Sequence, residues 1–158
     1  MAILEILKYM KKIVEKVVLV LLCVQVICLT ACAKGDKIVT FAELPTVAQT
    51  FVETHFGKQN ISIVMKDSEI FDTSYDVIMK DGSKVEFDKK GEWTSVKCIN
   101  NAVPKVIVPQ SISEYVSQNY PDVLITGIEK DKKEFEIHLS NRLELTFNKQ
   151  GALIDIDD

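Results

Sequence analysis

Few side chains of this chain have the types and spacing that catalysis or metal binding requires. Among its 158 residues are two histidines, His55 and His138. His138 alternates with Glu136 along a predicted strand, so both side chains share one face. A metal site completed by nearby carboxylates is the alternative to an ordinary solvated surface there, and we expect the surface. Neither a glycine-rich phosphate loop nor the ligand spacing of an EF-hand occurs. We therefore expect no enzyme, no cofactor and no metal ion.

The cysteines do not form a disulfide framework. Cys98 is the one cysteine beyond residue 32, so the rest of the chain has no internal partner for it. A nucleophilic thiol would need a base such as histidine within hydrogen-bond distance. Free cysteines are more often small buried hydrophobic residues, and we expect that role for Cys98. The domain must then be stabilised by its core alone.

The first 31 residues have the composition of a secretory signal. Three lysines (Lys11, Lys12 and Lys16) precede the apolar run VVLVLLCVQVICL at 17–29, and small residues follow it. This run is shorter than the ~20 residues that a membrane-spanning helix needs. A positive start, a short apolar stretch and a small-residue exit are typical of a signal peptide. We predict a signal at 1–31, with 1–9 as an upstream start extension.

The end of this signal carries a motif for lipid attachment. Leu29-Thr30-Ala31-Cys32 resembles the lipobox of bacterial lipoproteins, in which the cysteine is acylated and becomes the new N-terminus. Two or three acyl chains, at ~0.8 kcal/mol per buried CH₂, would anchor the protein firmly. Cleavage after Ala33, giving a soluble periplasmic protein, is the alternative, because Ala31-Cys32-Ala33 also fits the A-x-A rule. We predict export, lipidation at Cys32 and a short tether at 32–39.

Charge excludes one class of partner. Beyond residue 31 the chain holds 15 basic and 21 acidic side chains, without a basic cluster. Nucleic acids and anionic membrane surfaces attract basic patches. We therefore expect no nucleic-acid partner, and membrane contact through the lipid anchor alone.

The exported part contains an internal repeat. ELPTVAQTFVETHFGKQNISIVMKD (43–67) aligns with VPQSISEYVSQNYPDVLITGIEKD (108–131), and YDVIMKDGSKVEFDKKGEW (75–93) aligns with FEIHLSNRLELTFNKQGAL (135–153). The offset falls from 64 to 60, since the first copy has four extra residues near 68–74. The match preserves turn residues as well as apolar positions, which indicates duplicated units. We define a first repeat at 40–98 and a second at 99–158.

Each repeat begins with a predicted helix. Apolar residues recur at three- and four-residue steps from Leu44 to Phe56, giving one apolar face. Pro45 suits the first helical turn, and Gly57 suits the position after the helix. In the second repeat the apolar face runs from Ile112 to Tyr120.

Predicted strands follow each helix. Phe135, Ile137 and Leu139 alternate with polar residues, and Asp81-Gly82 is a strong hairpin signal. We expect an α+β fold of two tandem helix-plus-four-stranded antiparallel repeats. The helices should cover one sheet face and leave the other open to solvent. Edge strands of the two repeats are predicted to pair into one sheet.

The order of these motifs resembles a known family. The motifs that carry the resemblance are, in order, LP…F…HF/YP, Y/F-[DE]-[VI]-x-[ML] and V-x-F-D-K-x-G-x-W. Over 40–158 the chain is similar to the PepSY-like family of secreted, β-lactamase-inhibitor-like proteins of Bacteroides-type bacteria. The resemblance implies the fold of the β-lactamase inhibitory protein, whose open sheet face grips a partner protein. Arg142 departs from the family pattern, because it replaces the glycine of the second hairpin, and an altered turn is expected.

The expected function is non-enzymatic binding in the cell envelope. An open face would inhibit or sense an unidentified envelope protein; a structural or accessory lipoprotein without inhibitory activity is the alternative. Trp93 is either an interface anchor or a core residue, and we prefer the core because its equivalent is Leu153. The residues predicted to line the open face are Asp76, Ile78, Lys84, Glu86, Glu136, His138, Glu144 and Thr146.

Overall fold

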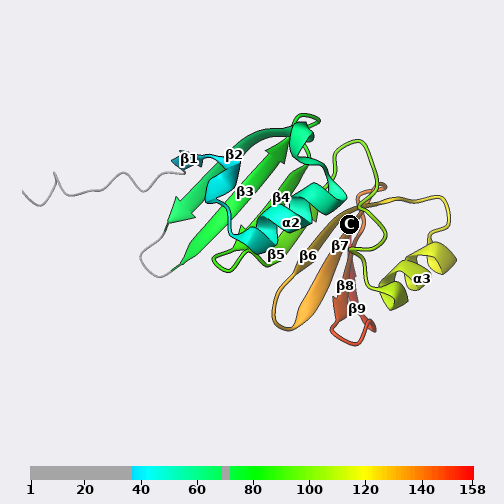
Figure 1. Ribbon diagram of the computed structural model, residues 1–158. Coiled ribbons are helices and arrows are strands. Elements are labelled where there is room, and N and C mark those ends of the chain that lie inside the picture. The colour runs from blue at the N-terminus through cyan, green and yellow to red at the C-terminus, as the bar shows by residue number, and fades with distance from the viewer. Residues whose placement is uncertain (1–36, 69–71) are drawn as a thin grey trace, which may run out of the picture. The chain divides into compact units, whose positions relative to one another are not determined.

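Within the residues that the structure describes, nine antiparallel strands lie in chain order in one sheet (Figure 1). The computed structural model describes residues 37–68 and 72–158; the predicted signal, Cys32 and most of the expected tether lie outside the described residues. The elements are β1 (Lys37–Val39), η1 (Phe41–Glu43), α2 (Thr46–His55), η2 (Lys58–Asn60), β2 (Ile61–Ser68), β3 (Thr73–Met79), β4 (Lys84–Asp88), β5 (Trp93–Lys97), α3 (Gln110–Asn119), β6 (Ile125–Lys130), β7 (Glu134–Leu139), β8 (Glu144–Asn148) and β9 (Leu153–Asp157).

The two long helices of the described part of the chain, α2 and α3, begin and pack in the same way. Each is ten residues long and follows a proline N-cap, Pro45 or Pro109. Phe51 of α2 meets Phe87 edge to face with ring centroids 5.7 Å apart, and Tyr115 of α3 meets Phe147 at 5.4 Å. These equivalent contacts confirm the predicted duplication. Among the described residues, no helix is long and apolar enough to cross a membrane.

The sheet is continuous across the junction between the repeats. β5 pairs with β6 through Ser95↔Glu129, Val96↔Ile128 and Lys97↔Gly127, which confirms the predicted pairing of edge strands. Irregularities in register also recur, at Ile61/Ile63 and again at Ile125/Gly127. Because bulges are positional features of a strand pair, their repetition reflects the duplicated sequence.

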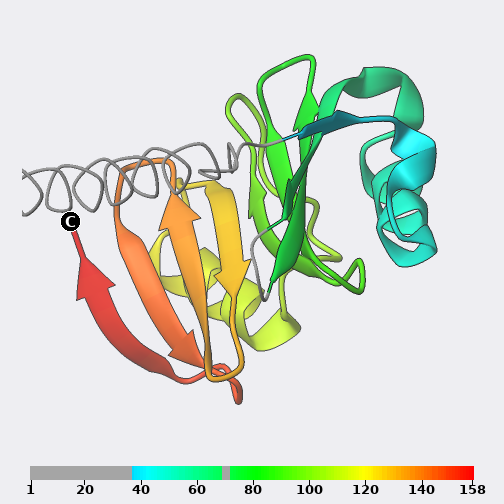
Figure 2. The same ribbon diagram turned by 90° about the vertical axis from the view of Figure 1, so that its left-hand side faces the viewer.

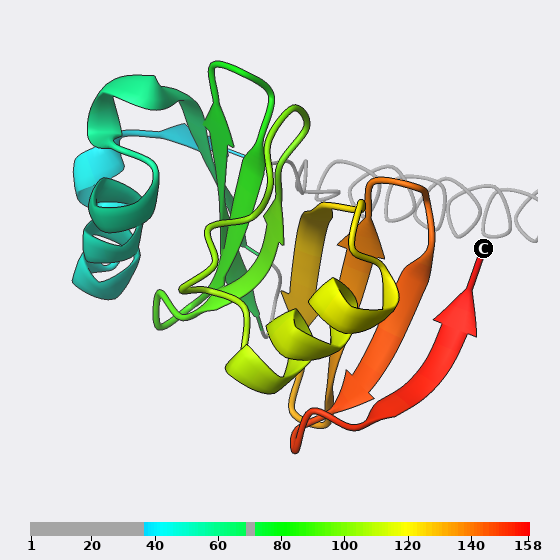
Figure 3. The same ribbon diagram turned by 90° about the vertical axis from the view of Figure 1, so that its right-hand side faces the viewer.

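The core lies between the sheet and both helices. Figure 2 views the second repeat from the strand side, with α3 behind the strands, and Figure 3 views it from the helix side. Alternate residues of the strands point toward the helices, as the period of two requires. The fully buried strand residues are Val77, Val85, Phe87, Val96, Ile128, Ile137, Leu145 and Phe147. The opposite face has no helix over it in the described part of the chain, as predicted.

The sheet starts earlier than the sequence indicates. Residues 37–39, expected at the end of the tether, form β1 and pair with β2, and Val39 is buried. This pairing satisfies backbone groups that β2 would otherwise leave unpaired at the sheet edge. In the second repeat the first strand begins at Ile125, after a turn in which the Val123 N–H donates to the Tyr120 carbonyl.

Arg142 does not change the second hairpin, so the expected alteration of that turn is wrong. Its N–H donates to the Leu139 carbonyl at 3.0 Å, as the Gly82 N–H donates to Met79 at 3.0 Å. Arg142 adopts the left-handed conformation with φ 76°, close to the φ of 87° at Gly82. A non-glycine residue in this conformation costs about 1–2 kcal/mol. The strand pairing on both sides of the turn is therefore strong enough to hold Arg142 in the left-handed conformation.

Candidate functional site

The open sheet face carries two rows of side chains that run across the strands. Directly paired residues of an antiparallel sheet share a face, so each row follows from the register. The first row consists of Ile38, Met65, Asp76, Glu86, Ser95, Glu129, Glu136, Thr146 and Asp155. The second row consists of Ile63, Ile78, Lys84, Lys97, Gly127, His138, Glu144 and Asp157. The structure places all eight residues predicted for the open face in these rows.

Lysines of the second row neutralise part of the acidic first row. Lys84 Nζ lies 2.8 Å from Asp76 and 2.9 Å from Glu86, and Lys97 Nζ lies 2.6 Å from Glu129. Partial burial opposes the charge of Lys84, but the hydrogen bonds to both carboxylates outweigh it and raise its pKa. Such exposed pairs contribute little stability. Their main effect is to order the side chains of the face.

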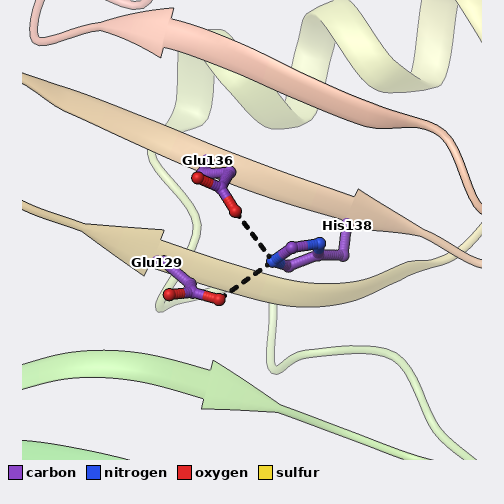
Figure 4. A group of neighbouring side chains, drawn as sticks. All are labelled: Glu129, Glu136 and His138. Carbon is purple, nitrogen blue, oxygen red and sulfur yellow. Dashed lines mark hydrogen bonds and ion pairs between the residues drawn. The ribbon is translucent and has the colours of Figure 1, made fainter. Parts of the chain in front are cut away.

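His138 lies among three carboxylates from three strands (Figure 4). Its Nε2 is 3.1 Å from Glu129 Oε1 and 3.3 Å from Glu136 Oε1. On the other side of the ring, Nδ1 is 3.3 Å from Glu144 Oε2. Glu129 was not among the predicted face residues, and the pairing of β6 with β7 places it opposite Glu136. The repeat alignment was the available signal, since it equates Glu129 with Met65 on the same face.

Carboxylates outnumber cations in this cluster, and their pKa values reflect it. Partial burial, the hydrogen bond to Glu144 and the negative charges of Glu144 and Glu129 raise the pKa of Glu136. Burial also opposes ionisation of Glu129, but hydrogen bonds from Lys97 and His138 outweigh it and lower the pKa of that carboxyl. The surroundings of Glu136 therefore disfavour its ionised form relative to a carboxylate in water, and an added positive charge would favour it.

The first repeat has an apolar patch in the equivalent place. Ile63, Met65 and Ile78 stand where the second repeat has Gly127, Glu129 and His138. Ile38, which is 66% exposed, extends the patch onto β1. We call Ile38, Ile63, Met65 and Ile78 the apolar patch. The open face thus has an apolar end and an acidic, histidine-containing end.

A depression at the junction of the repeats adds a buried hydroxyl to the acidic end. Its volume is about 250 Å³, and its lining includes Glu86, Ser95, Glu129 and Glu136. Ser95 is only 3% exposed, and within residues 37–68 and 72–158 its Oγ has no hydrogen-bond partner. Buried polar atoms are nearly always satisfied, so this hydroxyl points to a missing partner.

Trp93 and Cys98 do not belong to the open face. Trp93 stacks on Phe51 on the helix side, with 6.2 Å between the ring centroids. Lys130 Nζ lies 3.9 Å from the centroid of the Trp93 ring. Trp93 therefore packs against the core, as preferred from the sequence. Cys98 is buried, and burial raises the pKa of its thiol, which is the reverse of nucleophile activation. His55 ends α2 with its ring 4.7 Å from that of Phe51.

Fold and face together define a duplicated α+β protein with helices on one side of its sheet and a solvated face, partly apolar and partly acidic, on the other. The chain belongs to the PepSY-like family, whose model, described as "Putative beta-lactamase-inhibitor-like, PepSY-like", matches residues 73–155. No curated protein matches the chain. The family is not a known enzyme family.

Three solved structures from Bacteroides are similar to this chain. A putative periplasmic protein of the DUF2874 family from Bacteroides vulgatus ATCC 8482 is 46% identical, with TM-score 0.75, covering 80% of this chain and 99% of that one. A putative calcium-regulated periplasmic protein from Bacteroides thetaiotaomicron is 44% identical, with TM-score 0.75, covering 78% and 97%. A putative periplasmic protein of unknown function from B. vulgatus is 34% identical, with TM-score 0.74, covering 78% and 100%.

Proposed function

We propose that this protein is an exported, non-enzymatic binding module that holds a protein partner against its open sheet face, as an inhibitor or sensor. The continuity of that face across both repeats carries the proposal, because it places the apolar patch and the acidic first row on one surface. The inhibitor-like description of the family and the periplasmic description of the relatives support it.

The chemistry of the face indicates the chemistry of the partner. The two rows contain seven carboxylates (Asp76, Glu86, Glu129, Glu136, Glu144, Asp155 and Asp157) and two lysines (Lys84 and Lys97). Complementary potentials speed encounter and exclude wrong partners. We infer a partner that presents an apolar side chain to the apolar patch and flanks it with lysine or arginine residues.

Replacing Ile78 by aspartate is expected to weaken capture of this partner at least about tenfold, because a charge would be buried at the apolar patch. The full chain is immobilised, an envelope extract is passed over it, and the affinity of the captured protein is then measured at low and high salt. Val47→Asp is the matched control. Val47 is a half-exposed aliphatic residue on α2, on the helix side of the sheet, and this variant should bind within about twofold of wild type.

A partner that binds Ile78→Asp as tightly as wild type would contradict the open-face model. Binding that is insensitive to salt and is lost only in Val47→Asp would also contradict the open-face model. Because one relative is described as calcium-regulated, each measurement is made with and without Ca²⁺. Assaying the activity of the captured partner separates an inhibitor from an accessory lipoprotein.

We also propose that Cys32 anchors the protein to a membrane through attached lipid. Cys32→Ser removes the acylated atom, so the variant is expected in the soluble envelope fraction while wild type sediments with membranes. Fractionation followed by immunoblotting measures the distribution. Cys28→Ser, which changes a cysteine of the apolar run at 17–29, should leave wild-type retention unchanged. Membrane retention of Cys32→Ser equal to that of wild type would refute the anchor.

A further inference from the structure

We propose that Glu129, Glu136 and His138 bind one divalent transition-metal ion, such as Zn²⁺, on the open face of the second repeat. This site goes beyond the proposed protein binding and does not depend on it. The donors come from two neighbouring strands, β6 and β7, and the ion would sit over the sheet near the junction with the first repeat (Figure 4).

The donor atoms already have the spacing of a metal site. One nitrogen or oxygen from each of the three residues lies within 4.8 Å of the other two. His138 Nε2 is 3.1 Å from the Glu129 oxygen and 3.3 Å from the Glu136 oxygen. Ligand bonds of about 2.0–2.1 Å in a tetrahedron place donors about 3.3–3.4 Å apart. An ion can therefore enter with small side-chain shifts.

One carboxylate orients the imidazole of His138, and a glycine on the neighbouring strand leaves room for its ring. Glu144 Oε2 lies 3.3 Å from Nδ1, so the ring can donate there and leave Nε2 free to bind a metal. Carboxylates commonly fix metal-binding histidines in this way. Opposite His138, Gly127 has no side chain, and a Cβ there would be 2.7 Å from His138 Cδ2. The ring occupies the space that any other residue at 127 would fill.

A separate observation points to a polar ligand beside the same carboxylates. Ser95 pairs with Glu129 across β5 and β6, and its buried Oγ has no partner in the described part of the chain. Ser95, Glu129 and Glu136 line one depression of about 250 Å³. Water bound to a metal ion at Glu129 and Glu136 could donate to this hydroxyl, which would satisfy it.

The first repeat provides an internal comparison. Its equivalent positions hold Ile63, Met65 and Ile78, none of which offers a hard ligand atom. The second repeat thus differs from the first at three neighbouring positions at once. Two of them, Glu129 and His138, have metal-binding side chains, and the third, Gly127, leaves the space that the histidine needs. A single exposed ion pair would not require all three changes.

The donor set selects the class of metal. Ca²⁺ takes six to eight oxygen ligands, whereas this set includes an imidazole nitrogen. Imidazole with carboxylates suits Zn²⁺ and other first-row transition metals. Lys97 competes for the site, because its Nζ lies 2.6 Å from the Glu129 oxygen that also contacts His138. Its side chain is 51% exposed and can turn toward solvent when the ion binds.

Titration of the full chain with ZnCl₂, followed by calorimetry and by the imidazole NMR signals of His138, tests the site. We expect one saturable Zn²⁺ per chain, a shift of the His138 signals and a higher unfolding midpoint. His138→Gln should lose this binding, while the matched control His55→Gln should keep it. Equal Zn²⁺ binding by both variants, or saturable binding of CaCl₂ without ZnCl₂ binding, would overturn the proposal.

Two further variants separate metal binding from a plain ion-pair cluster. Gly127→Ala keeps every donor but displaces the ring, so Zn²⁺ affinity should fall about 10–100-fold while the unfolding midpoint without metal stays close to wild type. Lys97→Met removes the competing cation and should bind Zn²⁺ more tightly. Unchanged affinity in Gly127→Ala, or weaker binding in Lys97→Met, would overturn the site.

Discussion

Replacing Phe87 by alanine is expected to lower the free energy of unfolding by about 3–5 kcal/mol. The Phe87 side chain is fully buried under α2, where its ring meets Phe51 edge to face at 5.7 Å. Truncation removes this contact and leaves a cavity that the paired strands on both sides of β4 cannot close. Urea denaturation followed by tryptophan fluorescence and by circular dichroism measures the change.

Phe147→Ala is the equivalent change in the second repeat and should cost a similar amount. Phe147 is also fully buried and meets Tyr115 at 5.4 Å. Because the buried residues Val96 and Ile128 join the repeats across β5 and β6, both variants should unfold in one transition. Ile154→Ala, at an exposed position on β9, should stay within about 0.5 kcal/mol of wild type. Two separate transitions in either phenylalanine variant would show that the repeats unfold independently.

The repeat made most of this fold predictable from sequence. Pro45 and Pro109 mark equivalent helix starts, and the alternation at Phe135, Ile137 and Leu139 gives a strand with one buried face. Periodicity also determines which side chains share a face, so the open-face residues could be named in advance. These features are local, and the chain's own duplication provided a second sample of each.

Features that depend on register could not be predicted in the same way. Glu129 joins His138 because β6 pairs with β7 after an irregularity between Ile125 and Gly127. Sequence periodicity assigns faces within one strand but not the partner across a bulge. The pairing of β1 with β2 was missed for a related reason, since three residues are too few to show a period. Arg142 was misjudged because the pairing of β7 with β8 outweighs its local preference.

Replacing Gly91 by alanine is expected to cost about 2–5 kcal/mol of unfolding free energy. Gly91 adopts φ +83°, which costs an alanine about 1–2 kcal/mol. A Cβ there would also lie 2.7 Å from Pro45 Cβ and 3.0 Å from the Ala48 backbone nitrogen. These atoms belong to the start of α2, so relief requires the helix to move from the sheet, and such overpacking costs about 1–3 kcal/mol. Thermal and urea unfolding measure the total.

Gly82→Ala is the matched control, because it separates the conformational cost from the steric one. Gly82 has φ +87°, close to that of Gly91, but the atom nearest its added Cβ is the tip of the exposed Ile99 side chain, which can turn away. The loss of glycine's freedom in the unfolded chain is common to both variants and cancels in the comparison. Gly82→Ala should therefore cost about 1–2 kcal/mol. If Gly91→Ala costs no more than this, α2 is not held tightly against the turn between β4 and β5. The helix would then pack on the sheet more loosely than these contacts imply.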